Sequence, residues 1–129
     1  MLLLDTCVLI FDALAPARLG RAAAAALDRG EEEGALACSD ISLWEIAMLV
    51  ERGRFLPGTG AKEFIELALS SRGTAVLRIT AGIAARSASI PLHGDPADRI
   101  IAASAIEHNA VLVTPDKQLR KLAGLKTIW

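Results

Sequence analysis

Met1-Leu2-Leu3-Leu4-Asp5-Thr6 opens the chain, and the rest of the fold is organised around it. Three consecutive leucines followed by a carboxylate and a hydroxyl predict a short strand that is apolar on both faces and ends in a polar tip. A strand that is buried on both faces lies in the centre of its sheet. In open α/β sheets a crevice forms beyond the carboxyl ends of such strands, so we expect Asp5 to face this crevice.

The composition favours one soluble domain. The chain has 129 residues, which suits a single core, and we expect residues 1–129 to form one unit. Apolar residues make up 53% of the chain, an excess that indicates a buried partner surface. The formal charge of −1 means that any nucleic acid must be bound by a local basic patch.

The chain lacks the features of an exported or membrane protein. Its apolar start has no basic residues before it, and no apolar run reaches the roughly 18 residues of a membrane span. Cys7 and Cys38 form no CxxC pair and are expected to be buried thiols in a reducing compartment. The sequence therefore predicts a cytoplasmic protein.

Short apolar strands alternate with helical patterns along the whole chain. After the opening strand, the expected strands are 35–38, 75–79, 111–113 and 125–128. The expected helices are 7–14, 17–29, 43–51, 61–71, 81–89 with Thr80 as its cap, 97–108 and 117–122. Strands that are continuously apolar are typical of a parallel sheet with helices on both faces. The pattern predicts a three-layer α/β/α sandwich.

Five acidic residues lie where the predicted strands end or the following helices begin. They are Asp5, Glu45, Asp95, Asp98 and Asp116. In a parallel sheet these positions share one edge, so the carboxylates converge and repel one another. Oxygen ligands without a nearby histidine select a hard cation such as Mg²⁺ or Mn²⁺. Such a site supports metal-assisted attack of water on a phosphodiester.

Most of these acids also have an ordinary structural explanation. Glu45 lies three residues after Ser42, which is the spacing of a capping box. Asp95 precedes a proline like a helix N-cap, and Asp98 then falls in the first turn of that helix. Asp116 follows a Thr-Pro pair in a similar arrangement. Asp5 is the acid for which no capping role is expected.

Four motifs occur in the order and spacing of the PIN-domain family. They are the opening LLLDT, Ser42-Leu43-Trp44-Glu45, the stretch from His93 to Ala105, and Val111-Leu112-Val113-Thr114-Pro115-Asp116. The likeness covers nearly the whole chain, and the sequence most resembles VapC-type ribonuclease toxins. The resemblance implies an Mg²⁺- or Mn²⁺-dependent endoribonuclease that cleaves RNA, forms a homodimer and is neutralised by a cognate antitoxin.

The same resemblance assigns roles to individual residues. The catalytic and metal-binding acids would be Asp5, Glu45, Asp98 and Asp116. Three hydroxyl residues would orient these acids or the water molecules on the metal: Thr6, Ser42 and Thr114. Asp95 is the alternative third metal acid, and Asp98 is preferred because it directly precedes the apolar helix segment 100–105. Arg99 would pair with an acid or contact phosphate, unless it is an ordinary surface arginine.

The remaining polar and aromatic residues give weaker expectations. Lys117, Arg120 and Lys121 could form the local basic patch that RNA needs, although a solvated helix face explains them equally well. His93 and His108 are expected to be structural. Aromatic residues are few and tyrosine is absent, so few side chains are available to stack on RNA bases. The expected docking surface for an antitoxin or a second copy lies around Phe11, Leu14, Leu49 and Val50.

Two other functions fit part of the pattern. Haloacid dehalogenase-type phosphohydrolases also begin with a strand that ends in aspartate, but they need a second acid where this chain has Cys7. A non-catalytic α/β interaction module would use the acids only to cap helices. That explanation leaves the joint spacing of the acids as a coincidence.

Overall fold

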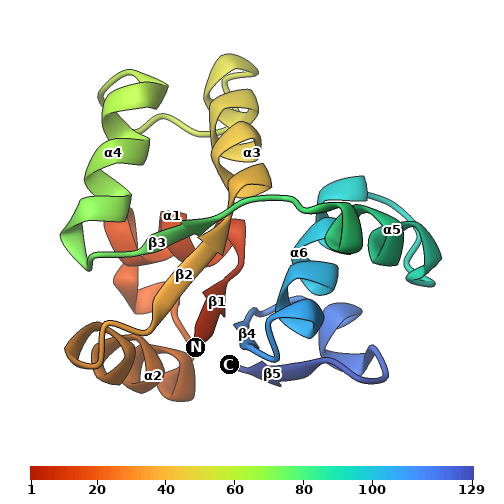
Figure 1. The fold of residues 1–129 in the computed structure, drawn as a ribbon. Coiled ribbons are helices and arrows are strands. Elements are labelled where there is room, and N and C mark those ends of the chain that lie inside the picture. The colour runs from red at the N-terminus through yellow and green to blue at the C-terminus, as the bar shows by residue number, and fades with distance from the viewer.

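A computed structural model describes residues 1–129 and contains five parallel strands between two layers of helices (Figure 1). The strands are β1 (Leu2–Leu4), β2 (Leu36–Ser39), β3 (Ala75–Leu77), β4 (Val111–Val113) and β5 (Lys126–Ile128). Their order in the sheet is β3-β2-β1-β4-β5. The leucine-rich β1 is therefore central, as its two apolar faces predict, and the three-layer α/β/α fold is confirmed.

The helices differ from the predicted ones mainly at two places. The α-helices are α1 (Thr6–Leu14), α2 (Arg21–Glu32), α3 (Asp40–Glu51), α4 (Ala61–Ser71), α5 (Ala81–Ser89) and α6 (Pro96–Glu107). The predicted helix 17–29 is divided by extended backbone at Leu19 and Gly20 into a 3₁₀ turn, Pro16–Arg18, and α2. The predicted helix 117–122 is only a 3₁₀ turn, Leu119–Lys121, because so short a segment cannot offset the cost of helix nucleation.

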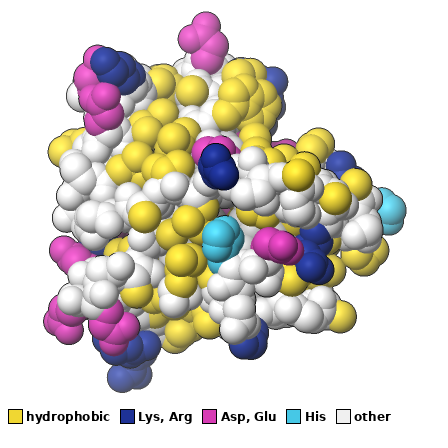
Figure 2. Space-filling view, in the orientation of Figure 1, with side chains coloured by type: hydrophobic (Ala, Val, Ile, Leu, Met, Phe, Trp, Pro, Cys, Tyr) yellow, Lys and Arg dark blue, Asp and Glu magenta, His cyan; other side chains and the backbone are white.

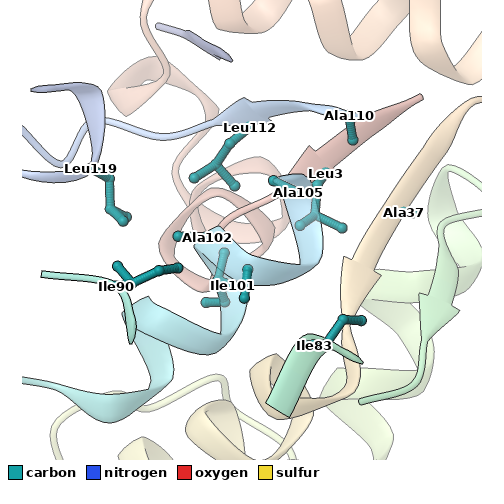
Figure 3. Packing of buried hydrophobic residues seen from close by; sticks show 11 residues of the cluster. Leu3, Ala37, Ile83, Ile90, Ile101, Ala102, Ala105, Ala110, Leu112 and Leu119 are labelled. Atoms are coloured by element: carbon teal, nitrogen blue, oxygen red, sulfur yellow. The ribbon is translucent and has the colours of Figure 1, made fainter. Parts of the chain in front are cut away.

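The two faces of the sheet carry separate hydrophobic clusters. Leu3 and Leu112 point into one cluster beneath α5 and α6, where they meet Ile101 and small alanines of α6 (Figure 3). Leu4 points into the other cluster, which is covered by α1, α2, α3 and α4. Consecutive residues of a strand thus point to opposite faces of the sheet. Burying one leucine completely stabilises the fold by about 1.5–3 kcal/mol.

Not every apolar position faces the core. Phe64 and Ala68 of α4 are buried, whereas Leu67 is 65% exposed. Positions 64 and 68 are four residues apart and share one helix face, and position 67 is rotated away from that face. None of the helices combines the length and the apolar character needed to cross a membrane.

The strand register aligns the carboxyl ends of the central strands. Leu4 of β1 is paired with Cys38 of β2 and with Val113 of β4. The next residues, Asp5 and Thr114, therefore emerge side by side at one edge of the sheet. The first residues of α1 and α3 lie at the same edge, because these helices follow β1 and β2 directly.

Candidate active site

A crevice of about 320 Å³ lies beyond the carboxyl ends of the central strands. Its lining comprises Asp5, Thr6, Cys7, Ile10, Glu45, Leu49, Asp98, Pro115 and Asp116. The four preferred acids of the sequence analysis thus line one crevice. Asp95 does not line it, although it borders two other hollows beside it.

Asp5 is held by a hydrogen bond across the sheet. It occupies the N-cap position of α1 but makes no side-chain capping bond, so both carboxylate oxygens are available for other contacts. The hydroxyl of Thr114 donates to Asp5 Oδ2 at 2.6 Å. Thr114 is fully buried and accepts the backbone N–H of Asp116 at 3.1 Å. One buried hydroxyl therefore orients Asp5 and ties it to the segment that carries Asp116.

Glu45 is held by a second hydroxyl network. The Thr6 hydroxyl donates to Glu45 Oε1, and Thr6 Oγ1 also lies 2.9 Å from the hydroxyl of the fully buried Ser42. The predicted capping box of Ser42 and Glu45 is wrong. The N-cap of α3 is Ser39, which accepts the N–H of Ile41, so Ser42 and Glu45 lie inside the helix. Their spacing places both side chains on the face towards Thr6.

The remaining acids divide between capping and lining the crevice. Asp95 is the N-cap of α6, with Oδ1 accepting the N–H of Ala97 at 3.0 Å, as predicted. Asp98 lies in the first turn of α6, and its side chain makes no hydrogen bond. Asp116 Oδ1 accepts the N–H groups of Gln118 and Leu119 at 2.7 and 3.0 Å. Asp116 therefore stabilises the following turn and borders the crevice at the same time.

Burial and mutual repulsion disfavour ionised acids in the crevice. Burial raises the pKa of Asp5, and the bond from Thr114 partly opposes that rise. Burial, with the negative charges of Asp5, Asp95 and Asp116, raises the pKa of Asp98 to about 6. Burial also raises the pKa of Glu45 to about 7, and neighbouring carboxylates add to the effect. A bound cation would relieve this repulsion.

Comparison with known proteins agrees with this geometry. The model of the PIN domain matches residues 2–125. The chain belongs to the PIN-domain family. It is 36% identical over 131 residues to ribonuclease VapC22 of Mycobacterium tuberculosis, an alignment that spans 98% of this chain and 97% of that relative. The resemblance to this family is confirmed, and the match sets aside the haloacid dehalogenase alternative.

Solved structures share the fold of this PIN domain. The crystal structure of VapBC2 from Rickettsia felis, bound to a DNA fragment from their promoter, aligns with a TM-score of 0.75 and 18% identity. DNA-bound VapBC from Salmonella typhimurium aligns with a TM-score of 0.72 and 18% identity. In both comparisons the alignment covers 98% of this chain and 96% of the other.

The donor atoms of the PIN-domain crevice fit a hydrated hard cation. No three carboxylate, imidazole or thiol groups lie close enough together to form a ready-made metal cluster. Zinc sites need such a cluster, but Mg²⁺ keeps several of its water molecules and uses one or two carboxylates. Burial and repulsion disfavour the ionised forms of the carboxylates in the crevice. A divalent cation would stabilise these ionised forms.

Several residues near the crevice differ from expectation or add to it. Cys7 was expected to be buried, but it is half-buried and lines the crevice, because it lies on the first turn of α1. Burial and the charge of Asp5 raise the pKa of its thiol, so it remains neutral. Arg99 is half-buried and makes no ion pair. Trp44 and Arg52, for which no site role was expected, border the hollow beside Glu45.

The metal-free protein should lose stability as the crevice acids ionise. Folding raises the pKa of Glu45 from 4.5 to about 7. The contribution of Glu45 to the free energy of unfolding is therefore fully present below its unfolded-state pKa of 4.5, and it is lost as the pH rises through the folded-state pKa of about 7. We expect Glu45→Gln to gain in free energy of unfolding relative to wild type between about pH 4.5 and about pH 8. Urea denaturation in EDTA measures this difference.

The control is Glu33→Gln, because Glu33 is exposed at the end of α2. Its difference from wild type should remain flat over the same pH range. A flat difference for Glu45→Gln as well would contradict the raised pKa.

Proposed function

We propose that this PIN-domain protein is an Mg²⁺- or Mn²⁺-dependent endoribonuclease and the toxin of a toxin–antitoxin pair. The convergence of Asp5, Glu45, Asp98 and Asp116 on one crevice carries the proposal. It is supported by the 36% identity to ribonuclease VapC22, which extends over nearly the full length of both chains. The substrate would be RNA, and its phosphodiester bonds would be hydrolysed.

Asp5 and Asp98 would bind the cation directly and Asp116 would bind it through a water molecule, with Glu45 adding negative charge beside them. When bound, the cation would activate water, neutralise the phosphate and stabilise the leaving oxygen. Asp98 is favoured over Asp95 as the third metal acid because its side chain is free of hydrogen bonds and lines the crevice. Asp95 is already engaged in capping α6.

The protein side chains would orient the reaction and move the proton. Thr114 fixes the Asp5 carboxylate through a buried hydrogen bond, so this ligand needs little reorganisation. Thr6 occupies Oε1 of Glu45, which leaves Oε2 to accept the proton of the attacking water. Arg99 and Lys117 would contact neighbouring phosphates, since neither makes an ion pair and each follows a crevice acid directly.

Asp5→Asn should abolish RNA cleavage without unfolding the protein. Replacing a residue that only supports a metal ligand costs about 10- to 100-fold in affinity or activity, so loss of a direct ligand should cost more than about 100-fold. Cleavage of a labelled RNA in Mn²⁺ measures the loss, and circular dichroism checks the fold. Glu33→Gln should cleave like wild type. Retained activity in Asp5→Asn would exclude this mechanism.

Thermal denaturation with Mn²⁺ should separate Asp98 from Asp95. A ligand present at 100 times its dissociation constant stabilises the native state by about 2.7 kcal/mol. Asp98→Asn should lose most of this stabilisation. Asp95→Asn should keep it, because asparagine caps a helix about as well as aspartate. The opposite result would make Asp95 the metal ligand.

A separate groove of about 600 Å³ suits an antitoxin segment. Phe64, Leu67 and Ala68 of α4 contribute apolar surface, and Leu14 at the end of α1 adds to it. Leu14 is thus the one residue of the expected docking surface that lines this groove. Hydrophobic side chains are spread over the molecular face that includes α3 and α4 (Figure 2).

Acidic residues border the same groove. Arg72 donates to Asp12 at 2.7 and 2.9 Å, to Asp28 at 2.9 Å and to Glu31 at 2.7 Å. Three carboxylates around one guanidinium leave a net charge of −2. We infer that the antitoxin segment is apolar with basic residues at its edge. Two solved structures with the same fold are VapBC complexes, which is consistent with a protein partner. A homodimer is proposed from the family resemblance alone.

Leu67→Glu should prevent neutralisation by the cognate antitoxin. A carboxylate on the apolar wall would face an acidic rim, and losing a central contact weakens an interface by about 2 kcal/mol or more, or roughly 30-fold. Titration calorimetry measures the affinity. Val76→Glu is the matched control, because Val76 is exposed on β3 outside the groove. Unchanged affinity in Leu67→Glu would exclude this groove, and RNA cleavage should be normal in both variants.

A further inference from the structure

Trp44 is the one aromatic side chain that the fold leaves exposed. It lies on α3 directly before Glu45 and is 55% exposed. The rings of Phe55 and Phe64 pack edge to face with centroids 5.0 Å apart. Phe11 is covered by the guanidinium of Arg18 at 4.0 Å. Trp129, the remaining aromatic, packs against Gly20 and the core. More than half of the surface of Trp44 remains open to solvent.

Trp44 stands between two hollows that continue from the acidic crevice. The nearer hollow, of about 140 Å³, shares Glu45 and Leu49 with the crevice and also borders Trp44, Asp95 and Arg52. The farther hollow, of about 390 Å³, shares Trp44 and Asp95 with the nearer one. A depression therefore runs along α3 from the acids, past Trp44, to the start of α6.

The farther hollow suits a nucleobase better than a phosphate. Four apolar residues line it with Trp44 and Asp95: Ile41, Pro96, Ala97 and Ile100. Its volume lies at the lower end of the roughly 300–1,000 Å³ typical of ligand pockets. The Asp95 carboxylate repels phosphate. Its Oδ1 caps α6, whereas Oδ2 makes no hydrogen bond and could accept the amino group of a base.

Arg52 provides the complementary charge on the same side. It follows Glu45 by seven residues, or two helical turns, so both side chains lie on one face of α3. Arg52 is exposed and makes no ion pair within the chain. A phosphate next to the one being cleaved could therefore reach Arg52 while its base lies beside Trp44.

We propose that Trp44 is the stacking platform for a base of single-stranded RNA next to the cleaved bond, and that the adjoining hollow favours bases with an amino group. The proposal rests on the proposed function, which it extends to substrate recognition. Few aromatics are present, but one exposed indole beside the acids is enough to position a single base. Stacking on an aromatic side chain is tolerant of sequence, so the preference would come from Asp95.

Tryptophan fluorescence can test the proposal independently of cleavage. Trp129→Phe leaves Trp44 as the single tryptophan, and Trp44→Phe leaves Trp129. Single-stranded hexamers of cytidine or uridine are titrated in EDTA at low salt, where no metal supports hydrolysis. We expect saturable quenching in Trp129→Phe, little quenching in Trp44→Phe, and tighter binding of the cytidine hexamer.

Affinity and cleavage complete the test. Trp44→Ala should weaken hexamer binding by about 5- to 150-fold, and raise the KM for RNA, whereas Trp44→Phe should bind within a few fold of wild type because phenylalanine still stacks. Absent quenching, wild-type affinity in Trp44→Ala, or equal affinity for the two hexamers would overturn the proposal. A changed molecular mass of Trp44→Ala in light scattering would do so too, by assigning this face to a second copy.

The outcomes separate this proposal from the proposed function. Wild-type cleavage with an unchanged KM in Trp44→Ala would overturn the stacking role and leave the ribonuclease intact. Quenching through Trp44 in a chain that never cleaves RNA would support the stacking role and overturn the ribonuclease.

Discussion

The hydrogen bond from Thr114 to Asp5 joins residues that are 109 positions apart and fixes the centre of the candidate site. It forms because β1 and β4 are paired in a register that aligns Leu4 with Val113. A shift of that register by one residue would turn every side chain of the strand to the other face. The same shift would separate Asp5 from Thr114, so the strand pairing and the site geometry depend on the same register.

The acids of the crevice oppose the stability that the core provides. Burial and repulsion raise the pKa values of Asp5, Glu45 and Asp98. Hydroxyl groups compensate in part, since Thr114 and Thr6 donate to two of these carboxylates. The remaining repulsion is a cost of folding without a cation, and a bound cation would relieve it.

The sequence predicted that the acids share one edge of the sheet, but not which contacts each of them makes there. Asp95 caps α6 as its Asp-Pro pair indicates. Glu45 has the spacing of a capping box, yet α3 begins at Asp40, and Glu45 contacts Thr6 instead. Spacing defines which residues share a helix face, but it does not define where the helix begins.

The opening strand, the parallel sheet and the arrival of Asp5 at its edge follow from local sequence, because burial pattern and strand length are properties of short segments. The choice of Asp98 over Asp95 as a lining residue of the crevice does not follow in this way. Nor does the continuous depression past Trp44, or the acidic groove around Arg72. These features depend on contacts between α1, α3, α4 and α6, whose relative positions are set by packing on the sheet and are not encoded in any one segment.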